Sequence, residues 1–152
     1  MKKCIMAIMF SLFSALTFAQ SSQALSDILD SERLTYGQLA YLIGTYKEII
    51  KDEESNDIDA TVKALSNIDF FPKDVKSTDY ATLGTTAMAL TKAARIRGGV
   101  FYRLTYGSQR YAIRELKALG VLPASADTSN SVNGREAIGI LYSLIAEDEP
   151  EE

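Results

Sequence analysis

Three stretches of this chain share one pattern, which constrains the fold more than any other feature. They are 34–39 (Leu-Thr-Tyr-Gly-Gln-Leu), 78–83 (Thr-Asp-Tyr-Ala-Thr-Leu) and 132–137 (Val-Asn-Gly-Arg-Glu-Ala). Each stretch contains a side chain typical of helix N-caps: Thr35, Asp79 or Asn133. Apolar residues at helical spacing follow each of these residues. Gln38 and Glu136 follow their caps by three residues, as in a capping box. Fixed offsets of this kind predict a repeated helical unit.

Hydrophobic periodicity extends this pattern along the chain. We predict long helices from Thr35 to Ile50, from Asp79 to about Arg95 with Tyr80 on its buried face, and onward from Asn133. Shorter helices are predicted over 58–67 and 109–119, while 23–31 fits either a short helix or an extended arm. Residues 64–72 parallel 115–123, since each is a helix end that leads through apolar residues to a proline.

The predicted architecture is therefore all-α, with little or no β structure. A single domain of repeated helix-loop-helix units is expected over 20–146, because such units bury their apolar faces only against one another. Residues 100–104 are expected to form a short apolar and aromatic link after Gly98-Gly99. A few extended residues are expected at most near Phe70 and Val121.

The two ends of the chain have compositions of their own. Lys2 and Lys3 precede an apolar run from Ile5 to Leu16 and the small residue Ala19, which predicts a signal peptide over 1–19. The expected location is periplasmic or secreted, and the cleaved protein is expected not to span a membrane. Residues 147–152 are predicted to form an acidic disordered tail.

Cleavage after Ala19 would leave neither cysteine nor histidine. Thiolate and imidazole metal sites are then excluded, as are Ser-His and Cys-His nucleophile pairs. The acidic run from Asp52 to Asp59 lacks the spacing of a calcium loop and is expected to be solvated, so no metal and no cofactor are predicted. An enzyme that uses carboxylates alone stays open as a minor alternative.

The predicted unit resembles the surface-layer homology module of cell-envelope proteins. The resemblance is best over 108–146, in the residues Leu119-Gly120-Val121-Leu122 and Val132 to Ala137, and it is weaker over 57–94 and 24–50. It implies a helical repeat fold and an envelope location. In that family an Arg directly after the capping Thr is associated with anionic wall polymer. Here that position holds Tyr36, Tyr80 or Gly134, with Arg135 one place late, so the fold is expected to carry over without that ligand site.

The middle of the chain is the candidate binding segment. No acidic residue occurs from Tyr80 to Arg114, and on the helix predicted over 109–119 three basic residues recur at the spacing of one stripe. Arginine suits phosphate and carboxylate, and tyrosine rings stack on sugars or bases. The candidate ligand-binding residues are Arg95, Arg97, Tyr102, Arg103, Tyr106, Arg110, Arg114 and Lys117. The alternative is that these charges are solvated or pair with the protein's own acidic segments.

These observations predict a non-catalytic, exported binding or scaffold protein of the cell envelope. Its expected partner is an anionic wall polymer or an acidic envelope protein, bound through the basic segment. Nucleic acid is not expected, because the signal directs the chain out of the cytoplasm and the formal net charge is −4. The alternative is a subunit of an envelope assembly that docks through its helical repeats, with 100–104 buried by the partner.

Overall fold

The computed structural model describes residues 23–47 and 57–148, and within them the fold is all-α, as predicted. Residues 23–29 are helical, which decides between the two predictions for this segment. The helices that follow are α2 (Tyr36–Tyr46), α3 (Ile58–Asn67), α4 (Leu83–Ala93), α5 (Val100–Leu104), α6 (Gln109–Ala118) and α7 (Gly134–Asp148). The predicted signal peptide, most of the acidic loop and the last four residues of the tail lie outside the described residues.

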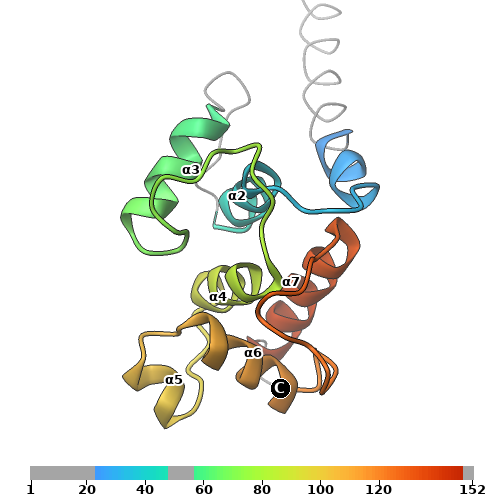
Figure 1. The fold of residues 1–152 in the computed structure, drawn as a ribbon. Coiled ribbons are helices and arrows are strands. Elements are labelled where there is room, and N and C mark those ends of the chain that lie inside the picture. The colour runs from blue at the N-terminus through green and yellow to red at the C-terminus, as the bar shows by residue number, and fades with distance from the viewer. Residues whose placement is uncertain (1–22, 48–56, 149–152) are drawn as a thin grey trace, which may run out of the picture.

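Helix α4 lies at the centre and contacts α2, α6 and α7 (Figure 1). Its apolar residues Leu83, Ala87 and Leu90 are buried, and so are its polar residues Thr85, Thr86 and Thr91. Helix α3 packs on α2, and α5 packs on α6. In Figure 1, α3 and α5 lie on opposite sides of α4. The result is one continuous core. No helix in the described part of the chain is long and apolar enough to cross a bilayer.

Three helix starts meet beside this core. The first residue of each helix donates its N–H to a carbonyl in the loop that leads to another of the three: Tyr36 to Asp79 (2.9 Å), Leu83 to Asn130 (2.8 Å) and Gly134 to Ser31 (3.1 Å). These bonds satisfy backbone donors that a helix leaves unpaired at its start. They form a closed cycle in which α2 binds the loop before α4, α4 binds the loop before α7, and α7 binds the loop before α2.

In each of α2, α4 and α7, the residue directly before the N-cap is apolar and buried. These residues are Leu34, Ala81 and Val132. Leu34 donates its N–H to the Val132 carbonyl (2.8 Å), and Ala81 donates to the Leu34 carbonyl (2.9 Å). The isolated antiparallel bridges of the described residues, Thr35 with Tyr80 and Thr82 with Ser131, lie at the same junction. The extended residues are therefore found here, and the expectation that they lie near Phe70 and Val121 is wrong.

Several local predictions of helix boundaries are confirmed, but α2 ends at Tyr46 with Lys47 as its C-cap, short of the predicted end at Ile50; residues 48–50 lie outside the described residues. Helix α3 has the predicted bounds, and Thr35 and Gln38 form the predicted capping box. Asn133 Oδ1 accepts from the N–H of Glu136 (2.8 Å) and the N–H of Asn133 donates to Glu136 Oε2 (3.0 Å), which completes the second box. Gly120, with φ of +73°, follows α6 in the left-handed conformation expected after a helix end.

The prediction that Asp79 caps α4 is wrong, because the helix begins three residues later. Thr82, not Asp79, is the N-cap, and its side chain accepts from the N–H of Thr85. Asp79 Oδ2 instead accepts from the N–H of Lys76 and closes a turn. Tyr80 is exposed, with the Arg33 guanidinium 4.1 Å from its ring centre, and is not on a buried helix face. The reason is that Tyr80 and Thr82 pair with other segments, which keeps the backbone extended until Thr82.

Residues 100–104 are a second correction, because they form the helix α5 and not a link. Gly99 is its N-cap, and the N–H of Gly99 donates to Glu115 Oε1 (2.8 Å) from α6. Tyr102 is the buried residue of α5. Five residues are too few to show helical periodicity in a sequence, so the helix was not predicted.

Candidate functional site

The candidate site is the surface of α5, the turn after it and the exposed side of α6. Tyr102 anchors α5 to the molecule, and two glycines with left-handed backbone, Gly98 (φ +46°) and Gly107 (φ +69°), lie against its ring. A Cβ atom at Gly107 would come 2.8 Å from the Tyr102 hydroxyl, so a larger residue does not fit there. The backbone of α5 is therefore held by one buried ring while its other side chains face outward.

The outward side chains of α5 are mostly apolar. Val100, Phe101 and Leu104 are 63%, 62% and 73% exposed, and Tyr106 in the following turn is 88% exposed. Only a few large apolar side chains are this exposed in the described part of the chain. Isolated exposed apolar residues are ordinary, whereas a group of them on one short helix is a feature typical of interaction surfaces.

An aromatic stack joins α5 to α6. The rings of Phe101 and Tyr111 are nearly parallel, at 13°, with their centres 6.0 Å apart. The Arg114 guanidinium lies 5.5 Å from the centre of the Tyr111 ring, which is a cation–π distance. Arg114 and Arg110 are both exposed and stand one turn apart on α6. Aromatic and cationic groups therefore form one continuous surface.

The structure divides the predicted binding residues into three groups. Exposed side chains on α5, the turn after it and α6 belong to Arg103, Tyr106, Arg110 and Arg114. Tyr102 is buried beneath them, and Lys117 donates from Nζ to the Ala124 carbonyl (2.7 Å), so it bridges α6 to the following loop. Arg95 and Arg97 are exposed in the segment between α4 and α5, where Arg95 has left-handed backbone (φ +53°).

Among the side chains of residues 23–47 and 57–146, no carboxylate pairs with the arginines of this surface. The ion pair found there joins Arg135 to Asp30 (3.7 Å), on another part of the molecule. Glu115, the acidic residue of α6, directs Oε1 to the backbone N–H of Gly99. The arginines of the candidate site are thus available to an external anion as far as the described residues are concerned.

Titratable groups with shifted pKa values have structural causes. Burial raises the pKa of Tyr102, and burial lowers the pKa of Lys92, whose Nζ donates to the Asp69 carbonyl (2.7 Å). Hydrogen bonds from the backbone and side chain of Ser129 lower the pKa of Asp127 in an exposed turn. The described residues include no group of three or more His, Cys, Asp or Glu side chains able to hold a metal ion.

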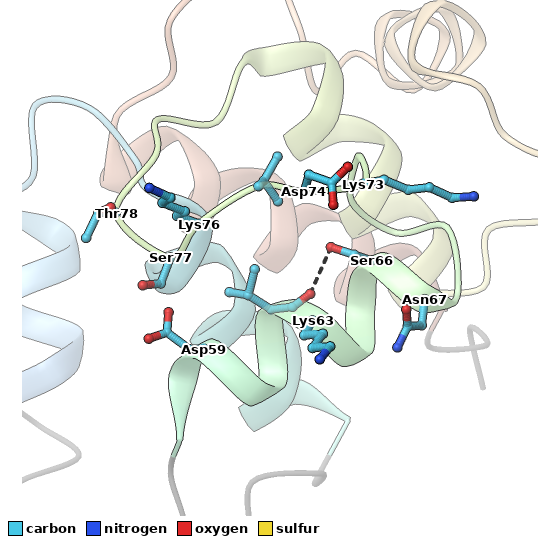
Figure 2. Close-up of a pocket in the computed structure, with 11 residues that line it drawn as sticks. Asp59, Lys63, Ser66, Asn67, Lys73, Asp74, Lys76, Ser77 and Thr78 are labelled. Atoms are coloured by element: carbon cyan, nitrogen blue, oxygen red, sulfur yellow. Dashed lines mark hydrogen bonds between the residues drawn. The ribbon is translucent and has the colours of Figure 1, made fainter.

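A hollow of about 790 Å³ between α3 and the loop over 73–78 was not predicted (Figure 2). Val62 and Val75 line it together with side chains of both charges, and Ser66 within it already donates to the Val62 carbonyl (3.0 Å). Its charged residues are Asp59, Lys63, Lys73, Asp74 and Lys76. Two segments separated by the exit of α3 build this hollow, and neither one carries a pattern that indicates it.

The position where the family resemblance places a binding Arg is buried at all three helix starts. With Thr82 as the cap of α4, this position holds Tyr36, Leu83 and Gly134. Arg135 is exposed one place later, where its Nε donates to the Leu29 carbonyl (3.2 Å).

Comparison of the chain with protein-family models, with curated proteins and with solved structures found no match.

Proposed function

We propose that this chain is an exported, non-catalytic binding or scaffold protein of the cell envelope that holds an anionic partner on α5 and α6. The proposal of this site rests on one observation. Arg103, Arg110 and Arg114 are exposed, Arg114 lies over the Tyr111 ring, and no carboxylate among residues 23–47 and 57–146 lies within salt-bridge distance of the three arginines. Arginine binds carboxylate and phosphate through several donors at once.

The envelope location rests on the predicted signal peptide and on the resemblance to surface-layer homology modules. The cycle of hydrogen bonds among the starts of α2, α4 and α7 supports three related units, because each start makes the same kind of contact. The buried residues after the three caps argue against a wall-polymer site at the helix starts. The proposed partner therefore binds at α5 and α6.

A second candidate function is a subunit of an envelope protein assembly. The exposed apolar side chains of α5 favour it, because a partner that covers them removes apolar surface from water. Both candidates place the partner on the same surface and differ in what the partner is.

Cosedimentation with envelopes isolated from the source cells tests the binding site. The test variant carries Arg103→Ala, Arg110→Ala and Arg114→Ala, and the matched control carries Lys63→Ala, Lys73→Ala and Lys76→Ala at the hollow beside α3. Both variants lose three positive charges from exposed positions. Three exposed charge pairs are worth about 1.5 kcal/mol together, so the arginine variant should bind roughly tenfold more weakly.

The lysine control should bind as tightly as the unmodified protein. Raised salt should weaken the binding of the control and of the unmodified protein alike. Equal binding by the arginine and lysine variants, or no binding by the unmodified protein, would reject the proposed site.

A further inference from the structure

The partner of the candidate site must satisfy two chemistries at once. The positive charges of Arg103, Arg110 and Arg114 favour an anionic partner, while Val100 and Leu104 expose aliphatic side chains. Sugar rings stack on aromatic side chains, but aliphatic side chains offer a polysaccharide neither a flat ring nor a hydrogen bond. A protein segment with both carboxylates and apolar side chains satisfies both requirements.

We propose that α5 and the adjoining side of α6 form the docking surface for an acidic, apolar-containing segment of another protein. Apolar side chains of this segment cover Val100, Phe101 and Leu104, and its carboxylates meet Arg103, Arg110 and Arg114. The charge pattern of the chain supports this occupant, because no acidic residue occurs between Tyr80 and Arg114. The inference rests on the proposed function and names its partner.

The docking surface is organised before a partner arrives. The Phe101 ring is held against Tyr111, and Tyr111 in turn lies under the Arg114 guanidinium. Tyr102 holds the α5 backbone between Gly98 and Gly107. Side chains that are already ordered lose less freedom on binding, which favours affinity.

Salt alone does not separate an acidic protein from an acidic polymer, so the experiment removes protein from the envelopes. Cosedimentation is measured with untreated envelopes and with envelopes digested by a broad protease that is then inactivated. We expect digestion to abolish binding. Retained binding after digestion would overturn the protein partner in favour of a wall polymer, while leaving the arginine site intact.

A substitution pair tests the apolar half of the surface. Leu104→Ser removes an exposed apolar side chain from α5, and the control Tyr142→Ser removes one from α7, where Tyr142 is 75% exposed. Circular dichroism should show both variants folded. Leu104→Ser should weaken envelope binding roughly tenfold, and Tyr142→Ser should leave it unchanged. Equal binding by the two variants would overturn the inference.

Two fluorescein-labelled peptides of equal length and equal Glu content provide a defined probe. One carries Leu and Phe at every third or fourth position, and the other carries Ser at those positions. Fluorescence anisotropy should show at least a roughly tenfold preference for the apolar peptide, lost in Leu104→Ser. Equal affinity, or equal displacement of both peptides by alginate, would overturn the inference. Failure of the arginine variant to differ from its lysine control would instead reject the proposed function.

Discussion

Substitution of Gly84 by alanine should destabilise the protein, although Gly84 lies in a helix where alanine is ordinarily preferred. A Cβ atom at this position would come 2.9 Å from the Thr128 carbonyl oxygen, from Thr128 Cβ and from Gln109 Oε1. The backbone makes this approach because the N–H of Gly84 donates to the Thr128 carbonyl (3.0 Å). A backbone oxygen cannot rotate away as a side chain can, so α4 and the loop before α7 must separate.

Gly139 provides the matched control, since a Cβ atom there would meet nothing within 4 Å. Gly139→Ala should stabilise α7 by about 0.5–1 kcal/mol through helix propensity alone. Gly84→Ala has the same gain but adds about 1–3 kcal/mol of overpacking, for a net loss of up to about 2.5 kcal/mol. The same substitution is thus expected to have opposite signs at the two positions.

Urea unfolding followed by circular dichroism measures both free energies of unfolding. Thermal unfolding should show shifts of roughly 2–4 °C for each kcal/mol in a chain of this size. A Gly84→Ala variant as stable as the unmodified protein, or a shift of both variants in the same direction, would show that the Thr128 carbonyl does not exclude a Cβ atom at position 84.

Two further predictions concern the cap of α4 and the anchor of α5. Thr82→Ala should lower the free energy of unfolding by about 1 kcal/mol, because the Thr82 side chain caps the helix, and Asp79→Ala should cost less than half as much. Equal losses in urea unfolding would contradict the assignment of the cap. Burial holds the pKa of Tyr102 above its ordinary value of 10.0, so the folded state keeps this proton where the unfolded state has lost it. Stability is therefore fully present below about pH 10 and falls as pH rises above it, and Tyr102→Phe should make that fall smaller when unfolding is compared at about pH 8 and about pH 11. An identical alkaline fall in both proteins would exclude Tyr102 as its source.

Local chemistry was sufficient to predict the starts of α2, α3, α6 and α7. Thr35 with Gln38, and Asn133 with Glu136, are capping boxes whose partners lie three residues apart. The same reasoning failed at α4 because Asp79 and Thr82 are both acceptable caps. The pairing of Tyr80 with Thr35 and of Thr82 with Ser131 decides between them, and no local pattern indicates either pairing.

The candidate site shows the same division. The absence of acidic residues between Asp79 and Glu115 indicated a binding segment, and this absence is visible in the chain itself. Burial of Tyr102 and the bond from Lys117 to Ala124 depend on packing, so neither was predicted. The exposed apolar side chains of α5 were expected to be a link and became part of the surface.

The amino-acid pattern alone was enough to predict that this protein is helical, where α2, α3, α6 and α7 begin, and where its positive charge is concentrated. These properties follow from caps, periodicity and composition, which act over a few neighbouring residues. The start of α4, the existence of α5 and the exposure of each arginine became known only from the folded protein. They depend on contacts such as that of Ala81 with Leu34, between residues far apart in the chain, which form only when the core closes.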